Sequence, residues 1–471
     1  MIEIQFYNSL KKKKEAFTPI EAGKVKIYNC GVTVYDKCHL GHARGAINFD
    51  VLRRFLETLG YDVTYVKNYT DIDDKMINRA TERGITVAQL GEENIALHDE
   101  DMASLGIRPP HIAPRATEHM PEIVKLIESL IKQGHAYESS GDVYFKVRSF
   151  EDYGKLSGKS IEDLISGHRV ELGDLKEDPL DFALWKAKKE GEPFWASPWG
   201  EGRPGWHIEC SAMSQKYLGE TFDIHAGGSD LIFPHHENEL AQSQCGQGKP
   251  FVNYWLHNGM IQIEAQKMSK SLGNFATISD LVKIYEPELI RFFILSSQYR
   301  ASIDFSSEAL HHSLEGLDRI YDGLRRAQND WGELPTMEPD ERILKKKNQF
   351  FKALADDLNT PGAIASLFEL TRMLNTANNL EEVAMIYPQI LALGKVLGLL
   401  EADPQAWFKS PRIKEQGTQE LDAQTIEAML EERIQARAAK NWAKADEIRD
   451  QLVAQGIMLE DKEGKTLWKR N

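Results

Sequence analysis

Cysteine is scarce in this sequence, and long hydrophobic runs are missing. The 471 residues include four cysteines, Cys30, Cys38, Cys210 and Cys245, too few for a disulfide scaffold in a chain of this length. No stretch approaches the roughly 18 apolar residues of a membrane-spanning helix, and Met1–Gln5 lack the apolar core of a signal peptide. We therefore expect a cytoplasmic protein without membrane contact, whose thiols are reduced or bound to metal.

Positive charge is also in short supply. The chain has 57 Lys and Arg against 72 Asp and Glu, a net charge of −15, which argues against a nucleic-acid-binding surface over the whole molecule but not against a local basic track. Its 42% hydrophobic and 27% charged residues are typical of globular proteins. The length favours roughly two to four domains.

The N-terminal part alternates strand and helix patterns. Residues 25–28 and 62–66 have the composition of strands, and between them apolar positions from Ile47 to Leu59 repeat as on a buried helix that stops at Gly60. This order predicts a doubly wound, Rossmann-like nucleotide-binding domain of the α/β class.

The remaining patterns predict a second half of that domain and two further parts. The second half is expected at a strand over 222–225, a helix near 235–245 and a strand near 252–257. An insertion with a hairpin over 137–147 separates the two halves. Beyond residue 300 a helical period predicts a bundle, and a small C-terminal domain is led by a predicted helix from about 425 to 454.

Two loops have the composition of a polyphosphate site. His39-Leu40-Gly41-His42 lies between a strand and a helix, where free amides and the helix dipole favour an anion. Lys267-Met268-Ser269-Lys270-Ser271 is a cationic loop that can close over phosphates. Taken singly, the first loop is equally explained as a pair of surface histidines at a helix start. The second loop alone is better explained as a solvated lysine turn.

Cysteine, histidine and glutamate also occur in a metal-binding pattern. His235 and Glu239 are four residues apart, so a helix places them on one face, and two cysteines can add soft thiolates. The order of the residues is not that of a zinc protease. The sequence does not choose between Cys30 and Cys38, and isolated cysteines are more often buried apolar residues.

Together these segments resemble a known family. The two loops, in this order and around a split domain, resemble the paired signatures of class I aminoacyl-tRNA synthetases. Further segments are similar to those of the cysteinyl-tRNA synthetase family: residues 31–36, 69–75, 205–210 and 233–239. The resemblance runs from about residue 25 to the C-terminus and is thinnest over 325–420.

The resemblance implies a function and a cofactor. It implies an ATP- and Mg²⁺-dependent ligase, expected to be a monomer, that forms cysteinyl-adenylate and transfers cysteine to the terminal adenosine of tRNA(Cys). One Zn²⁺ per chain would hold the substrate thiolate and so separate cysteine from serine, which pocket shape alone distinguishes poorly. The implied zinc ligands are Cys30, Cys210, His235 and Glu239.

The resemblance also assigns roles to other residues. The implied catalytic residues are His39, His42, Lys267 and Lys270. The implied ATP contacts are His39, Gly41, His42, Gly228, Asp230 and Lys270. The amino-acid pocket would be lined by Thr70, Trp206 and His225.

The C-terminal domain supplies the local basic track. On a single helix Arg433, Arg437, Lys440 and Lys444 would form one stripe able to contact phosphate, although a solvated helix face explains the same charges. The resemblance implies that anticodon bases are read by Arg437, Trp442, Asp446 and Asp461. The spacing of Trp442 also fits the apolar face of such a helix.

The expected domain boundaries follow from these assignments. They are 1–130 and 201–255 for the two halves of the catalytic domain, 131–200 for the insertion, 256–310 for the lysine-loop region, 311–400 for the bundle, 401–425 for a linker and 426–471 for the anticodon-binding domain.

Two other functions share part of this pattern. One is a ligase that makes the same adenylate but passes cysteine to an amino-sugar, and the C-terminal domain argues against it. The other is a tRNA-binding or zinc-stabilised protein without catalysis, and the presence of His39, His42 and Lys270 argues against that.

Overall fold

A computed structural model describes residues 2–162, 175–263, 266–267, 276–414, 421–462 and 465–470. The chain forms two compact units. The first comprises residues 1–278, 294–305 and 351–363, and the second comprises 279–293, 306–350 and 364–471. No described helix has the length and apolar character required to cross a membrane.

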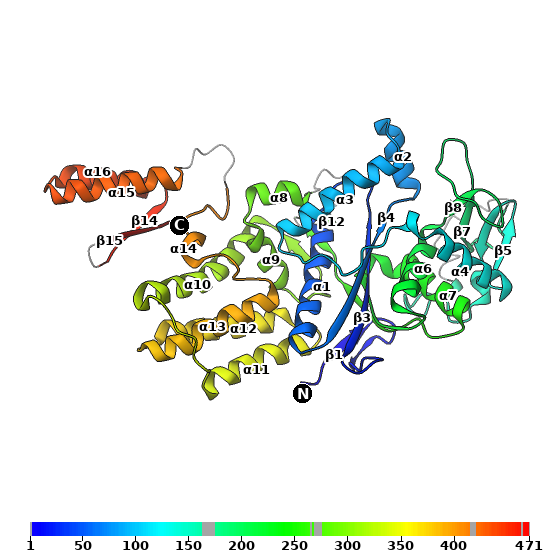
Figure 1. Cartoon of the computed structure of the whole chain (residues 1–471), viewed down its shortest axis with the longest axis horizontal. Coiled ribbons are helices and arrows are strands. Elements are labelled where there is room, and N and C mark those ends of the chain that lie inside the picture. Colours follow the sequence, from blue (N-terminus) through cyan, green and yellow to red (C-terminus); the bar gives the residue numbers. More distant parts are fainter. Residues whose placement is uncertain are drawn as a thin grey trace. The chain divides into compact units, whose positions relative to one another are not determined.

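A parallel sheet forms the centre of the first unit (Figure 1). Its strand order is β10 (Val252–Asn258), β9 (Phe222–Gly228), β3 (Lys24–Thr33) and β4 (Asp62–Thr70). The predicted first βαβ unit is confirmed, because α1 (Leu40–Thr58) joins the parallel neighbours β3 and β4. The inward stripe of α1 is fully buried and consists of Ile47, Val51, Leu52, Phe55 and Leu56.

The second half repeats this arrangement. β9 leads through a wide helical turn, Ile232–His236, into α7 (Glu237–Gln247) and then into β10, close to the expected ranges. α6 (Trp206–Leu218) packs on β3 and β4 and against α4 (Met120–Lys132) and α7. The carboxyl ends of all four parallel strands therefore share one edge, where open α/β sheets bind their ligands.

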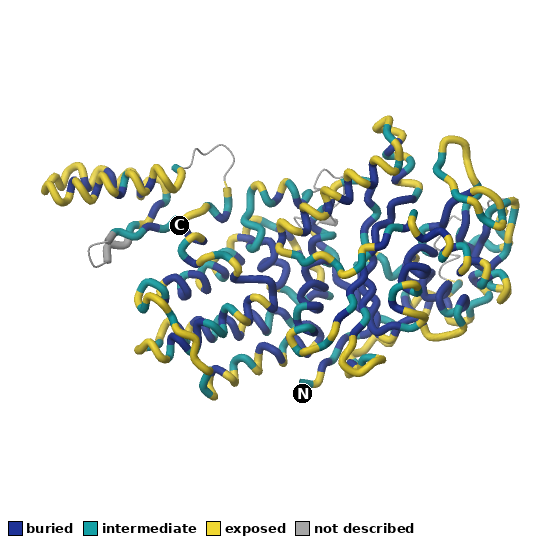
Figure 2. Tube along the Cα trace, in the orientation of Figure 1, coloured by how far each residue is buried: buried dark blue, intermediate teal, exposed yellow. Residues whose placement is uncertain are grey.

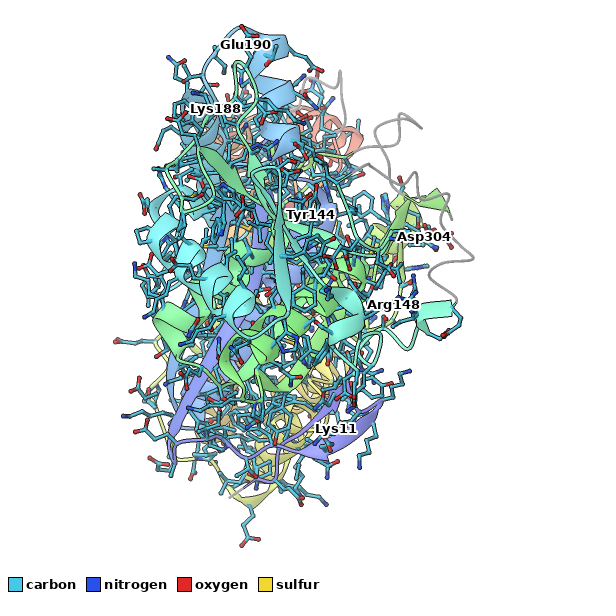
Figure 3. The ribbon with its side chains drawn as sticks, turned by 90° about the vertical axis from the view of Figure 1, so that its right-hand side faces the viewer. Lys11, Tyr144, Arg148, Lys188, Glu190 and Asp304 are labelled. Carbon is cyan, nitrogen blue, oxygen red and sulfur yellow. The ribbon has the colours of Figure 1, made fainter. Side chains whose placement is uncertain are left out.

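The insertion is an antiparallel sheet. Its strands are β5 (Ala136–Ser139), β6 (Asp142–Phe145), β7 (Phe182–Ala187) and β8 (Gly202–Pro204), in that order. The predicted hairpin is confirmed, since β5 and β6 turn at Ser140 and Gly141, which both have positive φ as a tight hairpin requires. Figure 3 views this side of the chain, with Tyr144 of β6 near the centre and Lys188 and Glu190 on the loop that follows β7.

Shorter elements complete the first unit. β1 (Gln5–Asn8) pairs with β2 (Lys13–Ala16), and β11 (Ile261–Ile263) pairs with both β12 (Gln266–Lys267) and β13 (Ile303–Phe305). α2 (Asp74–Arg83) and α3 (Val87–Ser104) follow β4.

The described part of the second unit is mainly helical. The bounds of its elements, including helices that begin or end in the first unit, are α8 (Ile278–Ile284), α9 (Pro287–Leu295), α10 (Ser307–Trp331), α11 (Glu341–Ala355), α12 (Thr360–Thr376), α13 (Leu380–Leu397), α14 (Pro404–Trp407), α15 (Ala423–Ala438), α16 (Trp442–Ala454), β14 (Ile457–Lys462) and β15 (Lys465–Arg470). The predicted helical face of α10 is buried at Leu310, Leu317, Tyr321 and Leu324. The expected bundle is confirmed.

The predicted single helix over 425–454 is wrong. α15 ends at Ala438, Lys440 adopts a left-handed conformation with φ 58°, and Asn441 caps α16 by accepting the N–H of Lys444. The Asn side chain satisfies an amide that a continuous helix would have bonded internally. The basic residues from Arg433 to Lys444 therefore do not form a stripe on one helix.

Candidate active site

Four side chains from distant parts of the first unit meet beside the central sheet. Cys30 comes from β3, Cys210 from α6, His235 from the turn before α7, and Glu239 from the first turn of α7. One ligand atom from each lies within 4.8 Å of the others, and all four residues are buried. We call this set the cysteine cluster.

The distances within the cysteine cluster are short enough for a shared ion. Cys30 Sγ lies 3.8 Å from Cys210 Sγ and 3.3 Å from Glu239 Oε1. His235 Nε2 lies 2.9 Å from the same Glu239 oxygen, at the predicted i, i+4 spacing. Two sulfurs, one imidazole nitrogen and one carboxylate oxygen are the donor types and number of a tetrahedral zinc site.

An irregularity in the sheet presents Cys30 to this cluster. The pairing of β3 with β4 shifts register between Asn29 and Val32, and there the Gly31 N–H donates to Asn68 Oδ1 at 2.9 Å. A Cβ on Gly31 would lie 1.5 Å from the Asn68 carbonyl oxygen, so only glycine fits. The structure thus places Cys30 in the cluster, whereas Cys38 lies in the loop before α1, its carbonyl accepting the Ile278 N–H.

The cluster carries separated charges. A hydrogen bond with Cys30 lowers the pKa of the Cys210 thiol to about 6, and His235 acts in the same direction against burial. Burial raises the pKa of Cys30 well above its usual value. Burial alone would lower the pKa of His235. Glu239 and Cys210 together outweigh this effect and raise the pKa of His235 to about 10.

Glu239 is the common acceptor of the site. Burial alone would raise its pKa, but His225 and His235 hold it well below the ordinary value. His225 Nε2 lies 2.9 Å from Glu239 Oε2, while His235 bonds the other oxygen. A divalent cation bound here would replace the proton on His235 and face a carboxylate and a thiolate already in place.

A second set of four residues also satisfies the metal-ligand geometry. It shares Cys30 and Glu239 and replaces the other two ligands by His225 and His236. His225 stacks on Trp255 with ring centroids 4.4 Å apart, and His236 Nδ1 lies 2.8 Å from His257 Nε2. The first set contains two thiolates, which suit Zn²⁺ better than one, and leaves His225 to orient Glu239 from outside.

The His39–His42 loop is built into the start of α1. His39 Nδ1 accepts the Gly41 N–H at 3.1 Å, and His42 Nδ1 accepts the His39 N–H at 3.3 Å. The two rings stack with centroids 3.8 Å apart. Because each neutral ring accepts at Nδ1, its proton lies on Nε2, as donation to a phosphoryl oxygen requires.

The segment that follows the lysine loop returns to these histidines. Leu40 N donates to Ala276 O at 3.2 Å, and His39 forms an isolated antiparallel bridge with Thr277. The backbone of Lys267 belongs to β12, while Lys270 lies outside the described residues. The structure therefore brings the flank of the lysine loop to the His39–His42 loop.

The other expected nucleotide contacts lie at the end of β9. Gly228 is the last residue of β9 and Asp230 is exposed in the turn that follows. A Cβ on the neighbouring Gly227 would lie 2.7 Å from the His236 ring, so the end of β9 needs glycine to approach this histidine.

Of the three expected amino-acid pocket residues, one is half-buried and two are buried. Trp206 is half-buried, with its ring centroid 4.3 Å from that of His235, so it borders the cysteine cluster. Thr70 is buried at the end of β4. His225 is fully buried and acts on the cluster through Glu239.

Several residues of the site were not predicted from the sequence. His207 Nδ1 lies 2.8 Å from His235 Nδ1, and Asn68 Oδ1 lies 3.8 Å from Cys210 Sγ. His236 and His257 continue a chain that ends at Ser9 Oγ, 2.8 Å from His257 Nδ1. Their adjacency to the motifs, as in Trp206-His207 and His235-His236, was the one available signal.

The expected anticodon residues lie on the C-terminal helices α15 and α16 and on strand β14 of the second unit. Trp442 begins α16 and is 58% exposed, outside the hydrophobic cluster of Ile426, Leu430, Ile448, Leu452, Ile457 and Trp468. Arg437 and Asp446 are exposed on α15 and α16, and Asp461 belongs to β14. Figure 2 shows how much of these two helices is exposed.

Comparisons with known proteins agree with this architecture. A family model described as tRNA synthetases class I (C) catalytic domain matches residues 16–315, a DALR domain model matches 349–401, and a cysteinyl-tRNA ligase anticodon binding domain model matches 419–468. Among solved structures, a Mycobacterium tuberculosis methionyl-tRNA synthetase in complex with methionyl-adenylate superposes with TM-score 0.58 at 15% identity, covering 79% of this chain and 89% of its own. The Agrobacterium radiobacter K84 agnB2 LeuRS structure superposes with TM-score 0.59 at 12% identity, covering 81% and 84%.

Sequence relatives are much closer. The cysteine–tRNA ligase of Methylococcus capsulatus is 51% identical over 470 residues, covering 99% of this chain and 100% of its own. That of Syntrophotalea carbinolica is 50% identical over 479 residues, with the same coverage. Fold and domain matches define a class I aminoacyl-tRNA synthetase. Within that class, the chain belongs to the cysteine–tRNA ligase family.

Proposed function

We propose that this protein activates L-cysteine with ATP and transfers it to the 3′-terminal adenosine of tRNA(Cys). The observation that carries the proposal is the cysteine cluster, with its two thiols within 4.8 Å of an imidazole and a carboxylate, in a member of the cysteine–tRNA ligase family. Family membership supports the reaction, and the cluster supports the choice of amino acid.

Adenylate formation would take place at the carboxyl edge of the parallel sheet. The cysteine carboxylate attacks the α-phosphate of Mg²⁺-bound ATP, a bond forms between them, and pyrophosphate leaves. His39 and His42 donate to phosphoryl oxygens from the start of α1, while Lys267 and Lys270 neutralise charge on the leaving pyrophosphate. Catalysis of this kind rests on positioning and on charge stabilisation.

The nucleoside would lie along the same edge. Gly41 allows the triphosphate to approach the backbone of α1, and Gly228 and Asp230 contact the ribose and the adenine beyond β9. The exposed position of Asp230 and the half-buried Gly228 support these assignments.

The amino-acid side chain would be selected at the cysteine cluster. Cys30, Cys210, His235 and Glu239 would hold Zn²⁺, which favours the soft substrate thiolate over the hydroxyl of serine. Trp206 borders the cluster and would cover the substrate. Thr70 would lie near the substrate, and His225 would orient Glu239. A discrimination of about 10⁴ corresponds to about 5.5 kcal/mol, so a metal–sulfur bond that serine makes poorly removes the need for an editing site.

In the second step the terminal ribose hydroxyl of the tRNA attacks the activated carbonyl and releases AMP. Anticodon recognition would lie with Arg437, Trp442, Asp446 and Asp461. The exposed indole of Trp442 supports a stacking role. We further propose that the protein acts as a cytoplasmic monomer.

The amino-sugar ligase receives no support. The match to an anticodon-binding domain at 419–468 and the coverage of relatives over their full length favour transfer to tRNA. A non-catalytic role would leave no purpose for the paired imidazole donors of His39 and His42.

Cysteine-dependent exchange between ATP and pyrophosphate, followed by charging of purified tRNA(Cys), tests the proposal. We expect both reactions, with serine inactive in the first. Absence of exchange would refute cysteine activation, and exchange without charging would redirect the proposal to another acceptor. Metal analysis of the purified protein tests the zinc assignment, for which we expect one Zn²⁺ per chain.

A further inference from the structure

A pocket of about 350 Å³ lies in the first unit between α1, β4 and α3. The segment 107–113 closes it and continues the sheet, because Lys67 N donates to Ile112 O at 3.1 Å and His111 N donates to Tyr65 O at 2.9 Å. None of the residues assigned above to ATP, cysteine or metal lines this pocket. Its volume is within the range of small-molecule sites, about 300–1,000 Å³.

The walls of the pocket are mainly apolar. The apolar lining residues are Ala46, Met102, Ala103, Ile107, Pro109, Pro110 and Ala113, and the titratable ones are Asp50, Arg53, Lys67, His98, Asp99 and Arg108. Tyr65 and Tyr69 add aromatic rings from β4. The apolar part of this lining suits an apolar or aromatic body.

Lys67 is one of the charged residues of this lining. It comes from the middle of β4 and keeps part of its surface accessible. Its ammonium has no hydrogen bond or ion pair with any residue that the structure describes. Burial lowers the pKa of Lys67, although the nearby Cys38 and Asp99 act to raise it. An enclosed cation without a partner is costly unless a negative charge joins it.

The carboxylates that line the pocket already have other donors. Asp50 Oδ2 accepts the Nε–H of Arg54 at 2.8 Å, and Asp50 Oδ1 lies 3.5 Å from Arg108 Nε. Asp99 accepts the Tyr69 hydroxyl in a short hydrogen bond. Neither carboxylate forms an ion pair with Lys67.

The two arginines of the lining are also paired. Arg53 Nε donates to Glu57 Oε1 at 2.9 Å, and Arg108 Nη1 donates to Glu57 Oε2 at 2.7 Å. Glu57 thus forms an ion pair with each guanidinium group, and Arg108 also faces Asp50. Of Arg53, Lys67 and Arg108, Lys67 is therefore the one that forms no ion pair with a carboxylate of the described residues.

We propose that this pocket, here called the Lys67 pocket, binds a small monocarboxylate with an apolar or aromatic body. The carboxylate pairs with the Lys67 ammonium, and the body lies against Met102, Ile107 and the two prolines. The occupant is distinct from the substrates of the synthetase reaction.

Isothermal titration calorimetry with the full chain tests the proposal. The probe is 3-phenylpropanoate, and the uncharged control ligand is 3-phenylpropanamide. We expect one acid molecule per chain and an affinity for the amide at least about tenfold weaker, the equivalent of about 1.4 kcal/mol for one charge-assisted pair. Saturating L-cysteine and ATP should not displace the acid.

Two variants locate the bound probe. Lys67→Met keeps the apolar stem and should weaken binding of the acid at least about tenfold, whereas Lys125→Met, the same change at an exposed position on α4, should have no effect. Ala103 is exposed at the rim, so Ala103→Trp should block both ligands without disturbing the core. Melting temperature and pyrophosphate exchange verify that each variant is folded.

Four outcomes would overturn the proposal. The first is that the acid does not bind saturably to the unmodified protein, and the second is that acid and amide bind with equal affinity. The third is unchanged affinity for the acid in a folded Lys67→Met or Ala103→Trp variant. The fourth is displacement of the acid by cysteine. Displacement would assign the probe to the amino-acid pocket instead. If Lys67→Met fails to fold, the Ala103→Trp variant and the competition with cysteine still show whether the acid binds in the Lys67 pocket.

Discussion

Two enclosed glutamates, one in each unit, have pKa values shifted in opposite directions. Glu239 in the first unit is fully buried among two histidines and two cysteines, and its pKa lies well below the ordinary value. Glu288 on α9 in the second unit receives hydrogen bonds from Leu400 N at 2.7 Å and from the Tyr321 hydroxyl at 2.8 Å. Burial raises its pKa to about 7.

The opposite pKa shifts of the two carboxyl groups distinguish a glutamate of the candidate site from one that takes part in packing. Charge around Glu239 keeps it ionised in a place where ionisation is costly, which is the signature of a functional site. Glu288 accepts hydrogen bonds from neutral groups, and burial favours its protonated form. The first unit therefore buries the cysteine cluster, while expected functional residues of the second unit, such as Trp442, are exposed.

Removal of a cluster thiol should give the largest effect. In Cys210→Ser we expect loss of bound zinc and a fall in cysteine-dependent pyrophosphate exchange of more than about 100-fold, beyond the usual cost of losing an outer partner of a metal site. Metal analysis and exchange kinetics measure this. Cys245→Ser is the matched control, since Cys245 is buried but outside both metal-ligand sets. Retention of zinc and cysteine affinity in Cys210→Ser would show that the ligand set is wrong.

A change at His225 should have a smaller effect and decides between the two ligand sets. If His225 orients Glu239 through the 2.9 Å contact, His225→Gln should weaken zinc binding or raise KM for cysteine about 10- to 100-fold. If His225 is itself a ligand, the variant should lose zinc as completely as Cys210→Ser. Zinc titration in competition with a chelator measures the difference, with the exposed His312→Gln as control.

Changes on the exposed C-terminal helices should separate charging from activation. In Trp442→Ala we expect kcat/KM for tRNA(Cys) to fall roughly tenfold, as loss of one base-stacking contact predicts. Pyrophosphate exchange and melting temperature should stay unchanged, because Trp442 lies outside the hydrophobic cluster. Val453→Ala, an exposed apolar change on the same helix, should leave charging intact. Equal losses in both variants would contradict a specific role for the indole.

The sequence was sufficient for most of the fold because its periodicities are strong. The alternation from Val25 to Val66 predicted the βαβ unit, and glycine at 141 marked the hairpin. The choice of Cys30 over Cys38 depended on a register shift held by Asn68, which has no sequence signal near either cysteine. The break at Lys440 was missed because a non-glycine residue adopts the left-handed conformation there.

The histidine contacts were missed for a different reason. His207 reaches His235 across two segments of the first unit, and only tertiary packing brings those rings together. A motif places side chains along the chain, whereas the roles of His225 and Asn68 depend on which neighbours they bond. The assignment of Thr70, Trp206 and the anticodon residues stays a prediction.

The smallest expected effect tests the packing role of Glu288. An acid whose pKa is higher in the folded state than in the unfolded state binds more protons when folded, so stability falls as pH rises from about 4.5 to about 7. Glu288→Gln keeps a carbonyl acceptor but removes the charge. We expect the melting temperature of the variant to exceed that of the unmodified protein at pH 8 and to match it near pH 5, with a gain below about 3 kcal/mol. Thermal unfolding at the two pH values measures it, and an equal change at both would show that ionisation of Glu288 does not affect stability.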